Sequence, residues 1–351
     1  MKVSKKEIEL SPYEIEVCGN YLIDARKRLK SDLDTQIYTG RKKYTNEEVA
    51  FKLKKTDSFD SHYLIKESLI YDKLKGIKRI PKLYHSGCQG IYRILIIELL
   101  GPSLKWLLKD VEGKFSLATT LKVGIQVLDI IKEIHKRGVV LRYLKPDNIV
   151  IGTGENKDYI YLLDFEIAKV YMKDGEHIPY RTNINVKGNR DYISLNVHYG
   201  NEVSRRDDIE SLGYNLIVFL KGKLPWSDIK RSDDIIEKKE NTSLDELCEG
   251  CPEEFKEFIK YSKELEFTQE PDYLYLNGLL YKVAEKNGID TDKVKYDWDI
   301  KKQKEEENIK SEKKRNNEEK KGKKNSKEEN ESENNDENKK EINYKVDEQN
   351  V

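Results

Sequence analysis

One stretch of the sequence, from Val140 to Glu166, limits most strongly what this chain can fold into. It begins VVLRYLKPDN, continues as IVIGTGENKDYIYLL and ends in DFE. Its middle part has two short apolar runs separated by glycine and polar residues, which is typical of a β-hairpin. Charged and amide side chains flank this hairpin on both sides. The stretch therefore predicts a packed scaffold that carries candidate functional residues.

The spacing in this stretch resembles the core pattern of protein kinases, H-R-D-x-K-x-x-N followed by D-F-G. Five residues stand where the pattern needs them: Arg142, Lys145, Asn148, Asp164 and Phe165. Three residues depart from the pattern at its His, Asp and Gly positions: Leu141, Tyr143 and Glu166. The resemblance implies the scaffold of a kinase with altered chemistry.

The exchange at Tyr143 has the largest chemical consequence. In the pattern, the Asp at this position accepts the proton of the substrate hydroxyl during phosphoryl transfer. An ordinary phenol, whose pKa is about 10, is mostly protonated at neutral pH and is a poor base. Asp147 is no obvious replacement, because it stands at a variable position of the motif. Leu141 replaces a His by an apolar group, and we expect it to pack in the core.

Length and charge set broad limits on the class of protein. A chain of 351 residues is long enough for one large or two modest domains. Its 65 basic and 65 acidic residues balance, so no net field favours nucleic acid or a membrane surface. The N-terminus lacks the apolar run of a signal peptide, and no stretch approaches the roughly 20 apolar residues of a membrane span. We therefore expect protein partners, no direct nucleic-acid contact and no membrane span.

Four cysteines in a chain of this length indicate a reducing, intracellular compartment, which is cytoplasmic, nuclear or both. Cys248 and Cys251 form a C-x-x-C pair, but structural zinc would need a second pair, and the sequence has none. Partly buried free thiols are therefore the expected state of these two residues. The oligomeric state stays open.

The composition changes at Lys301. From there to Val351 the chain is mostly Lys, Glu and Asn, with no apolar periodicity and one aromatic residue, Tyr344. Such a segment cannot bury enough apolar surface to offset its conformational entropy. We therefore expect residues 301–351 to form a disordered tail. Its basic clusters at 313–315 and 320–324 fit a solvated linker, while a nuclear address or a docking arm stays open.

Residues 1–300 divide near Glu98 into two parts with different patterns. In 1–98, the strand candidates 48–53 and 91–97 surround one helical pattern that ends before Gly76, a candidate C-cap. The apolar residues of that pattern are Leu64, Ile65, Leu69, Ile70 and Leu74. In 99–300 the patterns are helical, with apolar stripes at 117–134, 209–220 and 255–265 and a further helix after Pro271. The two parts predict an α+β fold with a small β-rich lobe, a larger helical lobe and a cleft.

Residues from both parts form a candidate nucleotide site. Lys52 ends the strand letters VAFK, which match V-A-I-K, whose Lys contacts the α- and β-phosphates. Glu67 lies on the following helical pattern, where kinases carry the Glu that holds this Lys. Asn148 and Asp164 supply oxygen ligands suited to Mg²⁺, and Lys145 is placed to contact the transferred phosphate. The set predicts a site for ATP and Mg²⁺, and its occupancy stays open.

The glycines that would close over the phosphates are missing. Alignment back from the letters IYTG at 37–40 puts Lys30, Asp32 and Thr35 at the three positions of G-x-G-x-x-G. Their side chains crowd the phosphates, and the Asp32 carboxylate adds like-charge repulsion. Glu166 in place of Gly stiffens the turn after Asp164 and adds a further negative charge.

Longer strings extend the resemblance to one family over about residues 15–300. They are ELLGPSL at 98–104, HIPYR at 177–181, SRRDDIESLGY at 204–214 and LPW at 224–226, which resemble segments of the casein kinase 1 family. The resemblance implies a bilobal protein-kinase fold, ATP between the lobes and Ser/Thr protein substrates in active members. It also implies that the backbone of Leu100 meets adenine and that Asp208 holds the catalytic-loop backbone.

The same resemblance bears on substrate choice. The family recognises acidic or phosphorylated substrates through a basic cluster, and Lys230 matches one member of that cluster. Asp191 stands where the family carries an Arg, with Arg190 beside it. The usual preference for phosphate-primed sites is therefore not implied for this chain.

Three functions stay open. The first, favoured by Tyr143 and the missing glycines, is a pseudokinase that acts as a regulator or scaffold, with binding of Mg-ATP undecided. The second is an active Ser/Thr protein kinase with an atypical catalytic loop, which the retained Lys52, Glu67 and Asp164 motivate. The third is an interaction module whose occluded pocket binds no nucleotide.

Overall fold

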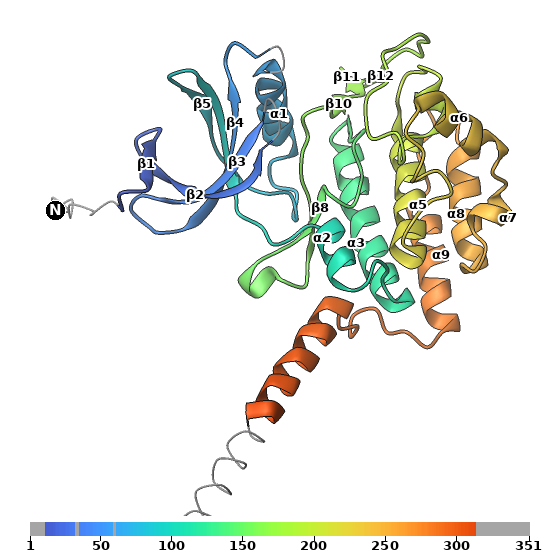
Figure 1. Cartoon of the computed structure of the whole chain (residues 1–351). Helices are drawn as coiled ribbons and strands as arrows, with labels where there is room; N and C mark the ends of the chain where they lie inside the picture. The colour runs from blue at the N-terminus through green and yellow to red at the C-terminus, as the bar shows by residue number, and fades with distance from the viewer. Residues whose placement is uncertain (1–10, 32–34, 59–60, 314–351) are drawn as a thin grey trace, which may run out of the picture. The chain divides into compact units, whose positions relative to one another are not determined.

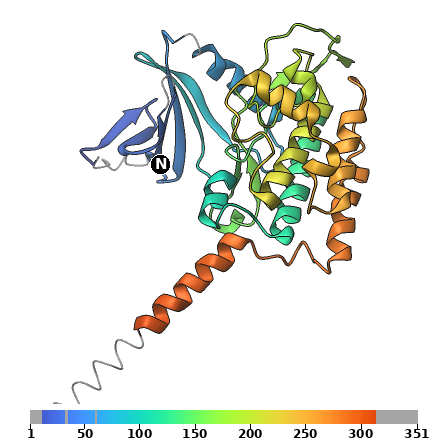
Figure 2. The ribbon, with the colours of Figure 1, turned by 45° about the vertical axis from the view of Figure 1, so that its right-hand side comes forward.

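The computed structural model describes residues 11–31, 35–58 and 61–313 and divides the chain into two units, Met1–Val294 and Lys295–Val351. The first unit begins with an antiparallel sheet in the order β1-β2-β3-β4-β6-β5 (Figure 1). Its strands are β1 (Glu14–Val17), β2 (Tyr21–Ser31), β3 (Gln36–Lys42), β4 (Glu48–Lys55), β5 (Leu83–Gln89) and β6 (Tyr92–Glu98). The sheet and α1 form one lobe and the remaining helices of this unit form the other, which confirms the bilobal α+β plan (Figure 2).

The alternation of side chains along β4 decides what each face of the sheet carries. Val49, Phe51 and Leu53 are buried in an apolar cluster with residues of the neighbouring strands. Because successive side chains of a strand point to opposite faces, Lys52 and Lys54 share the other face. Helix α1 (Ser61–Leu74) covers that face and ends before Gly76, whose φ of 89° is the left-handed conformation expected of a C-cap.

One part of the predicted apolar stripe of α1 is wrong. Leu64, Ile70 and Leu74 are buried, but Ile65 and Leu69 are 42% and 62% exposed. The helix rests on the sheet along one side only, and Glu67, Ser68 and Tyr71 occupy positions on that buried side. The inner face of α1 is thus partly polar, because it carries Glu67 toward the strand lysines.

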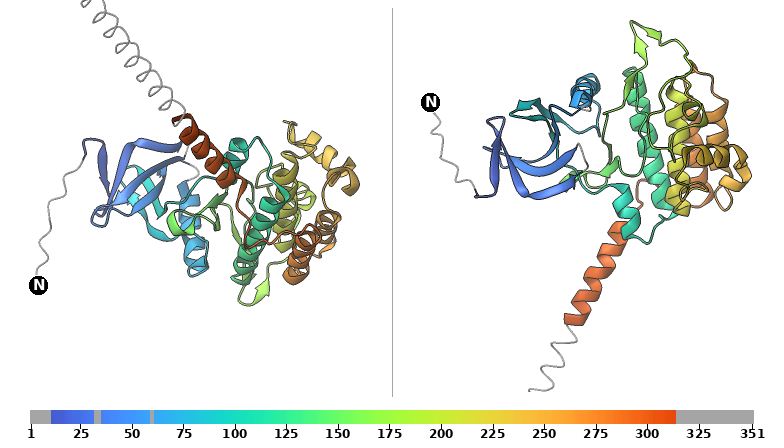
Figure 3. Two further views of the ribbon diagram at one scale, coloured as in Figure 1. Left: turned by 90° about the horizontal axis from the view of Figure 1, so that it is seen from below. Right: turned by 45° about the horizontal axis from the view of Figure 1, so that its top comes forward.

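The second lobe is built around long helices that lie side by side in both views of Figure 3. Helix α3 packs on α5 and α9, and α5 packs on α8. The prediction that a glycine ends each of two long helices is confirmed. Gly138, with φ 71°, follows α3, and Gly222, with φ 90°, caps α5. The helices are α2 (Leu104–Asp110), α3 (Leu117–Lys136), α4 (Leu195–His198), α5 (Arg205–Lys221), α6 (Ser232–Asn241), α7 (Leu244–Leu247), α8 (Glu253–Glu264) and α9 (Tyr273–Lys286).

The stretch from Val140 to Glu166 forms the predicted hairpin. Strand β8 (Ile149–Ile151) pairs antiparallel with β9 (Ile160–Leu162), and the short helix η1 (Gly154–Asn156) lies between them. Before the hairpin, β7 (Val139–Val140) pairs with β10 (Lys169–Val170), so the two ends of the stretch are tied together. A second small ribbon, β11 (Met172–Lys173) with β12 (Glu176–His177), follows. The hairpin therefore holds the flanking polar residues in one place.

The second unit departs from the expectation of a tail without structure from Lys301 onward. Residues 297–313 are helical. Lys, Glu and Gln are strong helix formers, and the helix carries side-chain pairs at i, i+4 spacing, such as Lys301 with Glu305 at 3.7 Å and Gln303 with Glu307 at 3.1 Å. The rest of the predicted tail, 314–351, lies outside the described residues.

Two further expectations concern membranes and thiols. Across the part of the chain that the structure describes, no helix combines the length and the apolar character needed to cross a membrane. All four cysteines are free thiols, with Cys248 buried and Cys251 partly buried. The expected state of the C-x-x-C pair is therefore confirmed.

Gly40 in β3 provides a test of the sheet packing. A Cβ atom at this position would overlap the carbonyl oxygen of Leu22 and the ring of Phe51. We expect Gly40→Ala to lower the free energy of unfolding by about 2–3 kcal/mol, because a packed strand cannot make room without moving backbone. Urea unfolding measures the change.

Gly278 in α9 is the matched control, since no atom lies within 4 Å of a Cβ placed there. Gly278→Ala should raise the free energy of unfolding by about 0.5–1 kcal/mol, because alanine is the better helix former. Equal stability of the Gly40→Ala protein and the wild type would contradict the packing described here.

Candidate active site

The first part of the site is an ion pair between the sheet and α1. Lys52 Nζ lies 2.8 Å from Glu67 Oε2, which brings together two residues that the sequence predicted as partners. The Glu67 side chain is buried and that of Lys52 is only 11% exposed, and a charge withdrawn from water is costly unless it is paired and hydrogen-bonded. Glu67 Oε1 also accepts a hydrogen bond from the backbone N–H of Phe165 at 3.3 Å. Glu67 thus ties α1 both to the sheet and to residues 164–166, here called the DFE segment.

Asp164 begins the DFE segment just after β9. Its Oδ1 lies 2.9 Å from Lys52 Nζ, so the Lys52 ammonium joins two carboxylates that are far apart in the sequence. Asp164 has a φ of 67°, a conformation that non-glycine residues adopt at a cost. The fully buried ring of Phe165 packs edge-on against Tyr71 of α1 at a centroid distance of 5.1 Å and helps to hold the segment in place.

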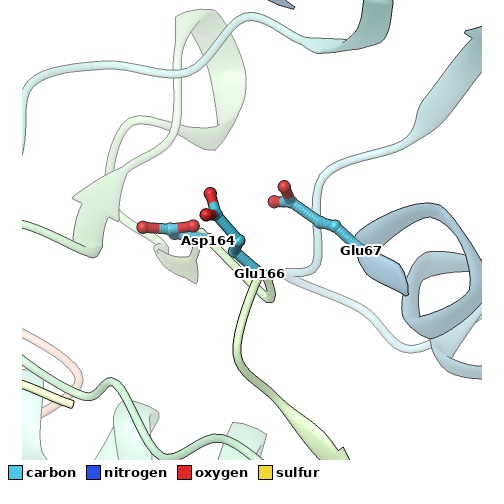
Figure 4. A group of neighbouring side chains, drawn as sticks. All are labelled: Glu67, Asp164 and Glu166. Atoms are coloured by element: carbon cyan, nitrogen blue, oxygen red, sulfur yellow. The ribbon is translucent and has the colours of Figure 1, made fainter. Parts of the chain in front are cut away.

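Glu166 has partners that the sequence reasoning missed. Its Oε1 lies 2.6 Å from Lys54 Nζ and its Oε2 lies 3.0 Å from Lys52 Nζ. Figure 4 shows the carboxylate of Glu166 between those of Glu67 and Asp164, and oxygen atoms of the three lie within 4.8 Å of one another. The charge that replaces the D-F-G glycine is therefore neutralised by a lysine from β4.

A signal for Lys54 existed in the sequence. Lys52 and Lys54 are two residues apart on one strand, so they project from the same face. Lys54 is only 3% exposed, and a lysine is almost never buried without a partner. The K-x-K spacing on the strand could therefore have indicated that Lys54 shares the face of Lys52, while its partner Glu166 follows only from the fold.

Burial and charge act against each other on the two central groups. Burial alone would lower the pKa of Lys52, but the carboxylates of Asp164, Glu67 and Glu166 outweigh it and hold that pKa well above its usual range. Burial raises the pKa of Glu67 to about 7, and Asp164 and Glu166 add to this effect while Lys52 opposes it. The Lys52 ammonium group therefore stays protonated, and three carboxylates share it as an ion-pair partner.

The backbone of the catalytic loop is fixed by Asp208 of α5, as the resemblance implied. The amides of Leu141 and Arg142 donate to Asp208 Oδ2 and Oδ1 at 2.7 and 2.9 Å. His135 Nε2 lies 2.8 Å from the same carboxylate. Arg142 has a φ of 67°, and these hydrogen bonds hold it there. The side chain of Leu141 is buried, as expected for an apolar replacement of His.

Tyr143, which stands where the kinase pattern has its proton-accepting Asp, is held by two neighbours in the loop. Lys145 Nζ donates to the Tyr143 hydroxyl at 3.0 Å and lies 4.2 Å from the ring centroid. Asn148 Nδ2 donates to the Tyr143 carbonyl at 2.9 Å. Asp147 turns toward α2, with Oδ1 3.0 Å from Lys105 Nζ. The structure therefore brings Tyr143, Lys145 and Asn148 together and directs Asp147 elsewhere.

The donor set fits Mg-ATP in several respects. Because Asn148 uses its amide nitrogen on Tyr143, its amide oxygen is left for a metal, and Asp164 supplies a carboxylate. Leu100 follows β6, and no described residue hydrogen-bonds to its backbone; that this backbone meets adenine stays a prediction. Gly101 and Pro102 beside it are fixed to Ile151 of the hairpin.

The positions of the missing glycines are described only in part. Lys30 lies in β2 and pairs with Ile37 of β3, after two irregularities in the register. Thr35 directly precedes β3. Asp32 lies outside the described residues, so its expected repulsion stays a prediction.

Residues 190–193, which include the substrate-cluster position Asp191, are anchored by Lys239. This lysine was not singled out from the sequence. Lys239 of α6 is 2% exposed, and its Nζ donates to the carbonyls of Ile193 at 2.6 Å and Arg190 at 2.9 Å. Burial lowers the pKa of Lys239 to about 7. Asp191 lies in the anchored segment, and its carbonyl accepts from Trp226 Nε1 at 2.8 Å. Lys230 is exposed.

The family model of the protein kinase domain matches residues 34–269, which include the strand lysines, the catalytic loop and the DFE segment. The chain belongs to the protein kinase family. The kinase domain is similar to two curated proteins of Schizosaccharomyces pombe. Casein kinase I homolog 1 is 40% identical over 274 residues, which cover 75% of this chain and 61% of that protein. Casein kinase I homolog 2 is 39% identical over 272 residues, which cover 75% of this chain and 62% of that protein.

This kinase domain is therefore casein kinase 1-like. The chain spans about three fifths of the length of these relatives. The residues matched by the family model include Lys52, Glu67, Asn148 and Asp164 as well as Tyr143 and Glu166.

The Lys54–Glu166 pair predicts a measurable coupling. We expect Lys54→Met to lower the free energy of unfolding by about 2–3 kcal/mol, because the Glu166 carboxylate would lose the lysine that neutralises it. Glu166→Gln in the same chain should restore most of that loss. Urea unfolding of the two single variants and the double variant measures the coupling.

An exposed ion pair serves as control. Lys223 and Asp228 lie 3.2 Å apart with 71% and 84% of their side chains exposed. Lys223→Met should change stability by less than about 0.5 kcal/mol. Additive effects of the two substitutions at Lys54 and Glu166 would contradict the pairing.

The raised pKa of Glu67 predicts a pH dependence of stability. Its pKa rises from 4.5 to about 7 in the folded state, so between these pH values the folded protein binds more protons than the unfolded chain. The contribution of this group to stability is therefore full below pH 4.5 and is lost as the pH rises toward 7. Glu67→Gln should flatten the fall of the unfolding free energy across this window.

Urea unfolding at several pH values measures both slopes. The control is Glu133→Gln, because Glu133 is half-exposed and pairs only with Lys136 of its own helix among the ion pairs of the described residues. The control should keep the wild-type slope. An unchanged slope in the Glu67→Gln protein would show that Glu67 does not titrate in this range.

Proposed function

We propose that this casein kinase 1-like domain acts as a pseudokinase. It binds Mg-ATP, transfers phosphate to protein substrates at or below the detectable rate, and serves protein partners as a regulator or scaffold. The observation that carries the proposal is Tyr143, whose hydroxyl receives a hydrogen bond from Lys145 at the position of the proton-accepting carboxylate. Tyr143 thus places a phenol where the kinase pattern has the carboxylate that accepts the proton of the substrate hydroxyl.

The neighbouring acid supports the loss of the base. Asp147 is the nearest carboxylate in the sequence of the loop, and its Oδ1 pairs with Lys105 on α2. Loss of a general base typically lowers the rate by about 10²- to 10⁴-fold. The altered glycine positions Lys30 and Thr35 remove positioning as well, and losses within one catalytic constellation reinforce one another.

The nucleotide half of the proposal rests on the residues that remain. Lys52 is held by Glu67, and Asp164 and Asn148 offer oxygen ligands close to the loop. When bound, Mg-ATP supplies the γ-phosphoryl group, and the metal offsets its charge. Glu166 adds a negative charge beside Lys52, but Lys54 neutralises it at 2.6 Å. This balance supports phosphate binding at Lys52.

A second candidate is an active Ser/Thr protein kinase with an atypical catalytic loop. It is favoured by the complete Lys52–Glu67–Asp164 arrangement, because kinase catalysis depends mainly on positioning and electrostatics. The protein substrates would then be those of a casein kinase 1-like enzyme.

Two measurements on the purified full chain separate these functions. Calorimetric titration with ATP, with and without Mg²⁺, measures binding, and labelled ATP with casein as acceptor measures transfer. We expect Mg-dependent binding, no labelled casein from the wild type, and labelled casein from Tyr143→Asp.

Lys52→Met is the control, and its folding is checked by circular dichroism. It should lose nucleotide binding while the exposed variant Lys223→Met keeps it. Casein labelling by the wild type that disappears in Lys52→Met would establish the second candidate instead. Absence of nucleotide binding would overturn the nucleotide half of the proposal.

A further inference from the structure

We propose that Tyr143 is a phosphoryl acceptor, and that the chain transfers the γ-phosphate of bound ATP to this phenol once and within the same molecule. The inference rests on the nucleotide-binding half of the proposed function. In this proposal, the tyrosine that stands at the position of the base is itself the site of modification.

The reach of the tyrosine side chain is the first argument. A carboxylate at this position holds the acceptor hydroxyl of a protein substrate beside the γ-phosphate. The ring and hydroxyl of a tyrosine extend several ångströms further from the backbone than the carboxylate of an aspartate. A phenol directed into the same space therefore occupies the place of the acceptor hydroxyl itself.

Lys145 indicates the direction in which the phenol points. Its Nζ donates to the Tyr143 hydroxyl at 3.0 Å and lies 4.2 Å from the ring centroid, so the ammonium group borders the ring and its oxygen. Lys145 is the residue that the kinase pattern assigns to the transferred phosphate. A phosphate held by this lysine lies next to the phenolic oxygen.

The backbone around Tyr143 is held on both sides. Asn148 Nδ2 donates to the Tyr143 carbonyl at 2.9 Å, and the Arg142 amide donates to Asp208 at 2.9 Å. On the other side, Asn215 Nδ2 of α5 donates to the Leu144 carbonyl at 3.4 Å. A nucleophile on a fixed backbone reacts as an intramolecular group, with a large advantage over one that must diffuse to the site.

The chemical step balances without a side-chain base. A lone pair of the phenolic oxygen forms the new bond to the γ-phosphorus, and the bond between that phosphorus and the β–γ bridging oxygen breaks. The electron pair of this bond leaves with ADP, and the phenolic proton passes to water. Lys145 stabilises the charge on the phosphoryl oxygens, and the loose transition state of phosphoryl transfer requires little push from the nucleophile.

The product limits the reaction to one turnover. Phosphotyrosine carries a charge of about −1.5 to −2 and keeps a charge-assisted contact with Lys145. Tyr143 is only partly exposed, which disfavours attack by a second molecule. The new phosphate lies where the γ-phosphate was, so the modified chain should bind ADP but reject ATP.

The experiment uses the purified full chain, first treated with a phosphatase that is then removed. After incubation with Mg-ATP, mass spectrometry of proteolytic fragments locates and quantifies phosphate. We expect at most one phosphoryl group per chain, located on Tyr143, and a rate constant that does not change over a hundredfold dilution. ATP affinity should fall at least tenfold after modification, while ADP affinity changes by less than threefold.

Matched variants test the assignment. Tyr143→Phe should bind Mg-ATP and gain no phosphate. Tyr159→Phe, which alters a half-exposed tyrosine on the β8–β9 hairpin, should be modified at Tyr143 like the wild type. Lys145→Gln should slow the modification at least tenfold.

Nucleotide binding, measured separately with ADP and ATP, distinguishes two kinds of failure. Binding of Mg-ATP without phosphate on Tyr143 would overturn this inference and leave the proposed function intact. Absence of nucleotide binding would overturn both. Phosphate on Tyr143 at a rate proportional to protein concentration, or phosphate on other tyrosines instead, would also contradict transfer within one molecule.

Discussion

The structure depends on one buried ammonium group, that of Lys52. It lies 2.8 Å from Glu67, 2.9 Å from Asp164 and 3.0 Å from Glu166, and so joins the sheet, α1 and the DFE segment. These carboxylates would repel one another in a buried space, and a lysine would be costly there alone. The ion pairs therefore define how the strand, the helix and the segment after β9 meet. A kinase needs the same groups to meet, because its lysine contacts the nucleotide phosphates.

The departures from the kinase pattern are absorbed locally. Glu166 brings a negative charge into the phosphate region, and Lys54 of β4 offsets it at 2.6 Å. Tyr143 replaces a carboxylate, but the loop keeps its backbone because Asp208 binds the amides of Leu141 and Arg142. Scaffold and chemistry are thus carried by separate interactions, so one can change while the other stays.

Much of the fold and part of the site followed from the sequence. The alternation on β4, the apolar stripes of α3 and α5, and the glycine stops at Gly138 and Gly222 are local patterns with direct conformational causes. The order of Lys52, Glu67 and Asp164 predicted their meeting, because a known core pattern fixes the elements that carry them. The loss of a general base that Tyr143 implies stays a prediction.

Only the tertiary structure decided the partners of charges that are distant in sequence. Lys54 and Glu166 are 112 residues apart, and no local pattern pairs them. The exposure of Leu69 and the burial of Lys239 likewise depend on which side of a helix meets its neighbours. The helix at 297–313 extends into the segment from Lys301 onward that composition alone marked as unstructured, and side-chain pairs such as Lys301 with Glu305 lie along it. The sequence determined which residues favour a strand, a helix or a turn, because these preferences are local. Packing decided which charges meet, because burial makes each one require a partner wherever the chain supplies it.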